Sequence, residues 1–335
     1  MDAYNKALGV PMMSEFDLIA RYFTRPTKRA RVGIGDDCAV IAPTPGMEMA
    51  ISTDTLVSGV HFFADADAEH LGHKALAVNL SDLAACGALP RFATLALTLP
   101  SVDAEWLRNF SLGFFALADE HDIELIGGDT TKGPLSITIT VMGEIEPGRA
   151  IRRNGANAGD AIWVSGELGE AALALMRLKV DRTKPHRLPN VSEAGLRRLT
   201  RPTPRVELGR ALVGVASAAI DLSDGLLADL GHIAENSMLG ATIARSHIPV
   251  PRAFSSLSSE LFAAAVLAGG DDYELCFTAP PEAHEQIETI SETLDVKLTC
   301  IGHVHARRAG VPLVMVQNAL GEDVTPTRTG FDHFG

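Results

Sequence analysis

The sequence predicts a two-domain protein of the α/β class, with α+β as its close variant. Short apolar runs typical of strands alternate with segments whose apolar residues recur at helical spacing. The chain has 335 residues, of which 46% are hydrophobic, enough for two buried cores. Residues 147–159 are rich in glycine, arginine and asparagine and separate two series of elements. We therefore expect an extension over residues 1–13, an N-terminal domain over 14–147 and a C-terminal domain over 148–335.

The N-terminal domain is predicted to open with a helix capped by Ser14, with Phe16, Ile19 and Phe23 on one apolar face. Beyond it the pattern runs strand, strand, helix, strand, helix, strand, strand. The strands are expected at residues 38–42, 49–52, 92–99, 123–126 and 135–142. The helices are expected at residues 68–86 and 103–121.

The C-terminal domain continues the alternation of strands and helices. Its strands are expected at residues 161–164, 218–222, 273–278, 297–302 and 312–316. Its helices are expected at residues 167–178, 192–199, 205–216, 226–235, 261–267 and 281–293. Short apolar strands that end on aspartate recur in both domains.

Composition and charge exclude several classes of protein. The net charge of −13 argues against a nucleic-acid binder, which needs a basic surface. The four cysteines lie far apart with no Cys-x-x-Cys pair, which favours free thiols in a reducing compartment over disulfides or a zinc site. The longest apolar run, residues 262–268, is too short for a bilayer, and no signal peptide is evident. These observations predict a cytoplasmic protein with no nucleic-acid or membrane partner.

One segment between two predicted strands combines features of a loop for metal-bound phosphate. Residues 127–134 read Gly-Gly-Asp-Thr-Thr-Lys-Gly-Pro. The glycines allow the backbone to approach a ligand closely. Asp129 offers the hard oxygens that Mg²⁺ takes, and Lys132 adds positive charge. Taken alone, such a segment is more often a Gly-Asp turn between strands.

The same local pattern, an apolar run followed by a small residue and then aspartate, occurs at six places. They are Asp36/Asp37, Asp54, Asp82, Asp129, Asp221/Asp224 and Asp271/Asp272. Helix capping or an Asx turn explains each one singly, but Asp82 lies inside a helical pattern where capping does not apply. Loops at like ends of strands gather at one edge of a sheet, so we expect the acids to meet there.

Gathered carboxylates need cations or protons, since two of them about 4 Å apart repel by about 4 kcal/mol at an effective dielectric of about 20. The candidate ligands are hydroxyl and carboxylate oxygens, with no histidine or cysteine cluster beside them. This donor set favours Mg²⁺ over Zn²⁺. A carboxylate magnesium site most often serves phosphate chemistry, because Mg²⁺ completes its coordination shell with substrate oxygens.

Motifs of other enzyme classes are missing from the sequence. It has no Gly-x-x-x-x-Gly-Lys-Ser/Thr P-loop, no Gly-x-Gly-x-x-Gly after a strand, no Gly-x-Ser-x-Gly elbow and no His-Glu-x-x-His. Two further residues allow two interpretations each. His61, the one histidine among the predicted loops, is a surface residue or a ligand. Arg153 is a solvated linker charge or a bidentate phosphate contact.

Six ordered motifs resemble those of the thiamine-monophosphate kinase family. They are Ile34-Gly35-Asp36-Asp37-Cys38-Ala39, Ile51-Ser52-Thr53-Asp54-Thr55-Leu56, Lys74-Ala75-Leu76-Ala77-Val78-Asn79-Leu80-Ser81-Asp82, Gly127-Gly128-Asp129-Thr130-Thr131, Asp221-Leu222-Ser223-Asp224-Gly225 and Gly269-Gly270-Asp271-Asp272-Tyr273-Glu274. The likeness covers nearly the whole chain, from about Ser14 to Phe334, with residues 1–13 extra.

The resemblance implies an ATP-dependent transfer of a phosphoryl group to thiamine monophosphate, giving thiamine diphosphate and ADP, the last step of thiamine diphosphate biosynthesis. It implies the fold of the aminoimidazole-ribonucleotide synthetase superfamily, in which the N-terminal sheets of two subunits form a barrel across a homodimer, with ATP near the interface. Several Mg²⁺ ions are expected between the two anionic substrates. The acceptor phosphate is already ionised at neutral pH, so direct in-line transfer needs no general base and no catalytic side chain.

Matched residue by residue, the resemblance implies three sets of site residues. Magnesium ligands are expected at Asp37, Ser52, Thr53, Asp54, Asp82, Asp129, Asp221 and Asp224. Nucleotide contacts are expected at Gly128, Asp129, Arg153 and Ser223, and substrate contacts at His61, Asp271 and Phe331. Two substrate positions depart from the family pattern. Asp271 stands where a relative has glutamate, and Phe331 stands where an aromatic residue with a polar tip is common.

Three alternative functions stay open at this point. A sister enzyme of the superfamily, such as the synthetase for aminoimidazole ribonucleotide or selenophosphate, shares the fold. The latter usually carries a reactive cysteine near a glycine-rich N-terminal segment, whereas Cys38 lies within the acidic motif. A magnesium-dependent phosphatase uses the same acids to activate water and needs no second substrate. A non-catalytic nucleotide-binding scaffold is disfavoured by the full set of acids.

Overall fold

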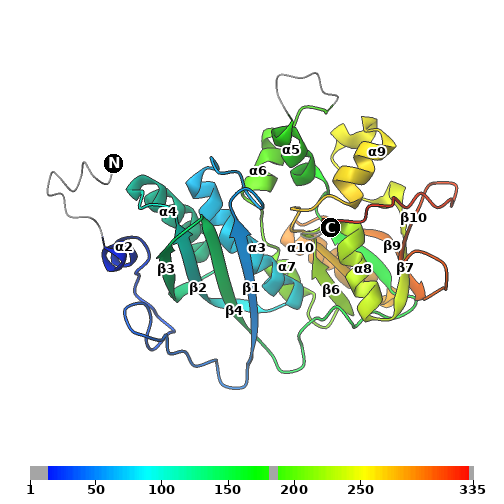
Figure 1. Cartoon of the computed structure of the whole chain (residues 1–335). Helices are drawn as coiled ribbons and strands as arrows, with labels where there is room; N and C mark the ends of the chain where they lie inside the picture. Colours follow the sequence, from blue (N-terminus) through cyan, green and yellow to red (C-terminus); the bar gives the residue numbers. More distant parts are fainter. Residues whose placement is uncertain (1–13, 181–187, 332–335) are drawn as a thin grey trace. The chain divides into compact units, whose positions relative to one another are not determined.

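The computed structural model describes residues 14–180 and 188–331, which form two compact units (Figure 1). Of these residues, unit 1 contains 14–45, 51–79 and 90–143, and unit 2 contains the rest. The expected extension over residues 1–13 lies outside the described residues. The domain limits drawn from the sequence stay a prediction.

A four-stranded sheet with the order β1-β4-β2-β3 forms the centre of unit 1. Its strands are β1 (Glu48–Val57), β2 (Leu89–Leu99), β3 (Glu124–Lys132) and β4 (Ser136–Ile145). The helices in this part of the chain are α2 (Glu15–Tyr22), α3 (Ala68–Cys86) and α4 (Ala104–Glu120). α3 and α4 lie along one face of the sheet (Figure 1).

Local sequence accounts for the helix ends and for the close approach of two helices. Ser14 caps α2 through a capping box with Asp17, so the predicted cap is confirmed. Asp103 caps α4 through its side chain. A Cβ added to Gly72 of α3 would lie 2.0 Å from the carbonyl oxygen of Phe110 of α4, so only glycine fits at this crossing.

The two faces of the sheet differ in polarity. Along β4, Ile137, Ile139 and Val141 are buried and alternate with the half-buried Thr138 and Thr140, so the apolar side chains share one face of the sheet. On the other face, the hydroxyls of Thr53 and Thr55 in β1 bond those of Thr140 and Thr138 in β4, at 2.8 Å each. The two pairs run in opposite chain directions, so β1 and β4 are antiparallel. Ile51 beside them is 64% exposed, and these five residues define what we term the open face.

Three expectations for unit 1 are wrong. Residues 38–42 form no strand, since Val40 makes only an isolated bridge to Val32. Residues 127–132, expected in a loop, continue β3, and residues 53–55, expected at a strand end, lie inside β1. On the open face these strands carry polar residues that resemble a loop in sequence, and pairing with the neighbouring strand overrides that local signal.

A six-stranded sheet with the order β10-β7-β9-β5-β8-β6 forms the centre of unit 2. Its strands are β5 (Ala161–Ser165), β6 (Ala218–Asp221), β7 (Leu239–Ala244), β8 (Leu275–Ala279), β9 (Leu298–Ala306) and β10 (Val314–Gln317). Only β10 and β7 pair in parallel; the other neighbours are antiparallel. The α-helices are α5 (Glu170–Lys179), α6 (Glu193–Thr200), α7 (Val206–Ala211), α8 (Leu226–Asn236), α9 (Ser259–Phe262) and α10 (His284–Leu294).

The core of unit 2 joins the sheet to α8, whose Leu230 and Ile233 are fully buried against strand residues such as Ile220. β7 was not expected, because its small residues Gly240 and Ala241 give a weak strand signal. The helix expected over residues 205–216 ends at residue 211. None of the helices in the described ranges combines the length and apolar character that crossing a bilayer requires.

Candidate functional site

The Gly-Gly-Asp motif lies inside β3, at an irregular point of its pairing with β2. Ala93 pairs with Leu125 and Thr94 with Gly127, so Ile126 is an extra residue that bulges from the ladder. A Cβ on Gly128 would lie 1.8 Å from the backbone oxygen of Leu95, and the φ of Gly128 is +148°. Strand packing therefore requires this glycine, whether or not a ligand also approaches it.

Asp129 follows the bulge and pairs with Ala96 of β2. Both residues are exposed and lie on the open face, opposite the buried side chains of β2. The bulge changes the direction of the side chains in this part of β3, because the successive residues Leu125 and Ile126 are both buried. The carboxylate of Asp129 is thus presented to solvent from an edge strand.

Asp54 lies in β1, at the other edge of the same sheet. Because side chains alternate along a strand, Ser52 and Asp54 point to the face opposite Thr53. On that face Asn79, buried within α3, accepts the backbone N–H of Asp54 at 3.0 Å. The bond satisfies a strand donor and holds the strand segment that carries the candidate ligands.

The order of strands separates Asp54 from Asp129 within one chain. Two strands lie between β1 and β3, so three spacings of about 4.8 Å put the two edges roughly 14 Å apart. The expectation that strand-end loops bring these two acids together is wrong for a single chain, because both lie inside strands and on opposite faces of the sheet.

Two further candidates of unit 1 lie in connections. Asp37 is exposed at the tip of a hairpin formed by residues 32–40, and its backbone N–H donates to Oδ1 of Asp36 at 2.8 Å. The Nδ1 atom of His61 accepts the backbone N–H of Val57 at 2.9 Å. This bond fixes the ring and directs Nε2 away from β1.

In unit 2, two loops are joined by backbone hydrogen bonds. The N–H of Asp271 donates to the carbonyl oxygen of Ser223, and the N–H of Tyr273 donates to that of Leu222, both at 2.9 Å. The approach is close, since a Cβ on Gly270 would lie 2.1 Å from the Ser223 oxygen. A candidate nucleotide contact and a candidate substrate contact are thereby held in fixed relation.

The C-terminal segment joins the same group. The N–H of Phe331 donates to the carbonyl oxygen of Asp224 at 3.1 Å, and Phe331 is 45% exposed. Asp229 of α8 accepts the N–H groups of Asp224 and Gly225 at 3.1 and 3.0 Å and so fixes the turn after β6. Sequence analysis gave Asp229 no role, although an acid in the first turn of a helix after Ser-Asp-Gly is a signal for such a contact.

Electrostatic effects on Cys86 and Asp229 connect three more candidates, Asp82, Arg153 and Asp221, with this group. Burial raises the pKa of the Cys86 thiol, Asp82 and Asp221 raise it further, and Arg153 lowers it. Burial also raises the pKa of Asp229 to about 7, against the lowering effect of its backbone hydrogen bonds and of Arg153. Unit 2 therefore brings its predicted site residues into one region, which consists of Asp82, Arg153, Asp221, Ser223, Asp224, Asp271 and Phe331.

The loop with Asp271 is held by two buried acids that sequence analysis did not assign. Asp272 accepts the backbone N–H of Gly169, and burial raises its pKa well above the usual range. Glu274 bonds Arg205 through Nε at 2.7 Å and Nη2 at 2.5 Å, and Arg198 through Nη1 at 3.3 Å. The arginines lie about 70 residues upstream, so no local pattern reveals the partnership.

The donor set fits Mg²⁺ bound together with phosphate rather than a closed protein cage. Among residues 14–180 and 188–331, no three acid, histidine or cysteine side chains form a ready-made metal cluster. Mg²⁺ typically takes one or two carboxylates and fills its shell with water and substrate oxygens. The exposed carboxylates of Asp37 and Asp129 offer hard oxygens of that kind.

Comparisons with known proteins agree with this chemistry. Residues 35–145 match the family AIR synthase related protein, N-terminal domain, and residues 157–314 match the corresponding C-terminal domain. A thiamine-monophosphate kinase of Salmonella typhimurium strain LT2 is 47% identical over 329 residues, which cover 96% of this chain and 98% of that protein. The chain belongs to the thiamine-monophosphate kinase family.

Solved structures of the thiamine-monophosphate kinase family share the fold. The enzyme from Stenotrophomonas maltophilia K279a is 44% identical with a TM-score of 0.78, covering 93% of this chain and 97% of that one. AaThiL complexed with AMPPCP and TMP is 30% identical with a TM-score of 0.71, covering 88% of this chain and 89% of that one. The two-domain aminoimidazole-ribonucleotide synthetase-like fold is thus confirmed.

Proposed function

We propose that the chain transfers the γ-phosphoryl group of ATP to thiamine monophosphate, giving thiamine diphosphate and ADP. The observation that carries this proposal is the 47% identity to a thiamine-monophosphate kinase over 96% of the chain. The joined loops of unit 2 support it, because they bring a predicted nucleotide contact, Ser223, next to a predicted substrate contact, Asp271.

The test is direct. The purified chain is incubated with ATP, Mg²⁺ and thiamine monophosphate, and the products are separated. We expect thiamine diphosphate and ADP in equal amounts. Release of free phosphate without any change in thiamine monophosphate would instead identify a magnesium-dependent phosphatase, and binding of ATP without turnover would identify a scaffold.

Both substrates are anions, so their approach requires compensating positive charge. We propose that several Mg²⁺ ions are held by Asp37, Ser52, Thr53, Asp54, Asp82, Asp129, Asp221 and Asp224. Bound there, they would neutralise the phosphates and the charge that develops on the leaving oxygen. Arg153 supplies the same kind of compensation from the protein, and its electrostatic effect on Cys86 and Asp229 supports a position beside the acids of unit 2.

The remaining residues orient rather than react. Gly128, Asp129 and Ser223 contact the nucleotide, and His61, Asp271 and Phe331 contact thiamine monophosphate in this proposal. An ionised acceptor phosphate needs no general base, so positioning and electrostatic stabilisation account for catalysis. Phe331 has no hydroxyl and therefore acts by stacking alone.

We also propose that the active form is a homodimer in which the unit 1 sheets of two chains join edge to edge into one barrel, with their open faces turned inward. The separation of Asp54 and Asp129 supports this, because Mg²⁺ binds its ligands at about 2.1 Å and cannot join groups roughly 14 Å apart. A second copy can bring its β3 edge to the β1 edge of the first.

The four free cysteines support a cytoplasmic location.

A further inference from the structure

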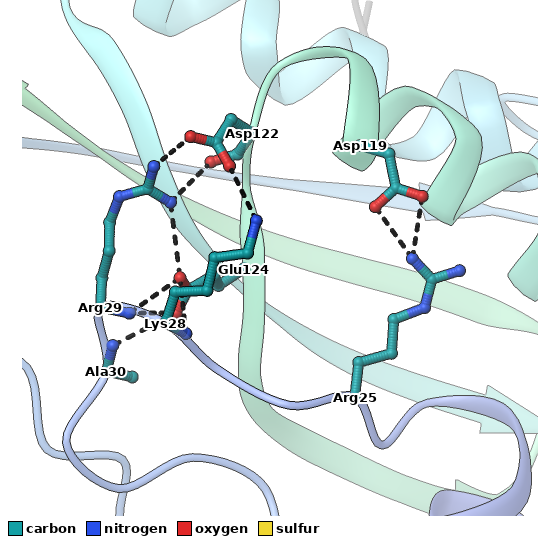
Figure 2. A network of polar contacts seen from close by, with 7 residues as sticks. All are labelled: Arg25, Lys28, Arg29, Ala30, Asp119, Asp122 and Glu124. Atoms are coloured by element: carbon teal, nitrogen blue, oxygen red, sulfur yellow. Dashed lines mark hydrogen bonds and ion pairs between the residues drawn. The ribbon is translucent and has the colours of Figure 1, made fainter.

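An arm of unit 1, residues 25–31, is fastened to the start of β3 (Figure 2). Both carboxylate oxygens of Glu124 accept hydrogen bonds from three successive backbone N–H groups. Lys28 donates at 3.0 Å, Arg29 at 2.9 and 3.1 Å, and Ala30 at 3.2 Å. The guanidinium of Arg29 adds a contact to Glu124 at 3.4 Å and also pairs with the Asp122 carboxylate. The Glu124 side chain is only 9% exposed.

A second fastening holds the beginning of the arm. Arg25 donates to both carboxylate oxygens of Asp119, at 2.9 and 3.0 Å, and its guanidinium lies 3.6 Å from the centre of the Phe115 ring. This pair differs from Glu124 in its surroundings, since the side chains of Arg25 and Asp119 are 46% and 69% exposed. Water screens it, so it contributes less to the order of the arm.

The arm leads directly into the hairpin that carries a candidate magnesium ligand. The N–H of Arg31 donates to the carbonyl oxygen of Val40 at 2.8 Å, and the N–H of Val40 returns a bond to Val32 at 2.9 Å. Asp37 lies at the tip of this hairpin. The last residue fastened by Glu124, Ala30, thus directly precedes the hairpin base, and no flexible linker separates the two.

We propose that Glu124 is a positioning residue that fixes the hairpin of residues 32–40, so that Asp37 is held in place for Mg²⁺-bound ATP. The proposal rests on the proposed function, which gives Asp37 its ligand role. Glu124 suits this task because it begins β3, the strand that presents Asp129 five residues later. One rigid strand therefore carries one ligand and anchors the segment that carries another.

The test uses Glu124→Gln, which keeps the shape of the side chain and removes its charge. An amide has one acceptor oxygen, so its NH₂ group would face backbone N–H donors. The matched control is Asp119→Asn, the same kind of change at the exposed fastening. We expect Glu124→Gln to raise the Mg²⁺ concentration for half-maximal activity by at least roughly fivefold, with the rate at saturating Mg²⁺ changed by less than about twofold. Asp119→Asn should match the wild type.

A second readout needs no catalysis. Trypsin can cut the arm after Lys28, Arg29 and Arg31, and mass spectrometry counts cuts at these bonds alone. We expect trypsin to cut the arm faster in Glu124→Gln than in the wild type or Asp119→Asn. Mg²⁺ should slow this cutting in the wild type and in Asp119→Asn but not in Glu124→Gln. This readout stays valid even if the wild type shows no kinase activity. That result would contradict the proposed function, but it would not contradict the attachment of the arm to Glu124.

Two outcomes would overturn the inference. One is an arm as resistant to trypsin in Glu124→Gln as in the wild type. The other is a freely cut arm with an unchanged Mg²⁺ requirement, because the arm would then not position Asp37. If Glu124→Gln does not fold, Arg29→Ala decides in its place, since it removes the guanidinium contacts to Glu124 and Asp122. Because this variant lacks the cleavage site after residue 29, only cuts after Lys28 and Arg31 are compared. It should shift both readouts in the same direction, and a variant identical to the wild type in both would count against the inference.

Discussion

Asp272 receives the backbone N–H of Gly169 with both carboxylate oxygens, at 3.0 and 2.9 Å, inside the core of unit 2. Its two neighbours, Asp271 and Tyr273, have φ angles of 69° and 49°, in the left-handed region that non-glycine residues seldom adopt. Such residues cost on the order of 1 kcal/mol each and persist where surrounding bonds hold them. The hydrogen bonds that the buried Asp272 accepts from Gly169 are among those that hold this loop.

We expect Asp272→Ala to weaken substrate binding more than it slows turnover. The alanine leaves the Gly169 N–H buried without this acceptor and frees the loop that carries Asp271. Steady-state kinetics should show a KM for thiamine monophosphate raised roughly tenfold, equivalent to ~1.4 kcal/mol. Asp272→Asn is the control: burial favours the neutral carboxyl and an amide oxygen can accept the same bond, so it should stay close to the wild type. Equal KM values for Ala and wild type would contradict the role.

Glu274→Gln should destabilise unit 2 strongly. The change takes the compensating charge from Arg205 at a side chain that is 2% exposed, and it leaves Arg198 with Glu170 as its remaining acidic partner. Breaking a buried ion pair in this way costs ~3–5 kcal/mol, which chemical denaturation can measure. The matched control is Glu207→Gln, whose partner Arg210 is also an arginine but lies on the surface, and it should cost ~1 kcal/mol or less. Similar losses for both variants would refute the argument from burial.

Asp229→Asn should change how stability depends on pH. The pKa of Asp229 is raised from 3.8 to about 7 in the folded chain, chiefly by burial. The folded state therefore binds the proton more tightly than the unfolded state does. The stability that this proton contributes is complete below pH 3.8 and is lost as the pH rises through about 7.

The asparagine cannot ionise, yet its oxygen can accept the N–H groups of Asp224 and Gly225. Relative to the variant, the wild type should lose up to ~1.4 kcal/mol of unfolding free energy per pH unit across this interval. Denaturation with a chelator present, at about pH 5 and about pH 8, measures the difference. Parallel pH profiles for the two proteins would show that Asp229 does not titrate there.

Alanine substitutions at two neighbouring glycines, Gly127 and Gly128, can distinguish a role in strand packing from a role in ligand binding. Gly128→Ala should prevent β3 from pairing with β2, because its Cβ would lie 1.8 Å from the Leu95 oxygen and its φ is +148°. We expect a loss of more than ~2 kcal/mol in thermal or chemical unfolding. In Gly127→Ala the new Cβ would lie 3.9 Å from the Thr94 side chain, an ordinary contact distance, so its fold should survive. A stable Gly128→Ala protein that lacks only ATP binding would assign the glycine to the ligand instead.

Asp54→Ala and Asp129→Ala should each abolish turnover while circular dichroism shows an intact fold, since both side chains are at least partly exposed. If the two acids act across a dimer, mixing the inactive proteins after unfolding and refolding should restore activity. Half of the dimers would be mixed, each with one intact site, giving about a quarter of the wild-type rate. No recovery from a mixture that contains mixed dimers would mean that both acids serve the site of their own chain.

Sequence reasoning was strongest where a pattern is local. The helical spacing over residues 68–86 matches α3, and Ser14 is the expected cap. It failed where distant pairing decides, as for residues 127–132, whose glycines and threonines resemble a loop until β2 supplies a neighbouring strand. The partnership of Glu124 with the arm joins residues more than 90 apart in the chain, and no motif spacing encodes it.

The same limit applies to the candidate site. The motifs allowed its residues to be named from sequence, and in unit 2 the structure brings Ser223 and Asp271 into adjoining loops. The sequence could not reveal that Asp54 and Asp129 lie at opposite edges of one sheet, since strand order depends on contacts among all four strands. Nor could it reveal that position 128 must be glycine because the carbonyl oxygen of Leu95 leaves no room for a Cβ there.

The hydroxyl pairs Thr53–Thr140 and Thr55–Thr138 bear on the solubility of a newly synthesised chain before the proposed dimer forms. Valine has nearly the shape of threonine, and four valines here would make an exposed apolar surface prone to aggregation. Threonine keeps that surface hydrated in the monomer. Because each hydroxyl already has a partner on the adjacent strand, water can later be expelled without stranding a polar group. In the proposed dimer, the same hydroxyls would thus keep the single chain soluble and then allow a contact without water.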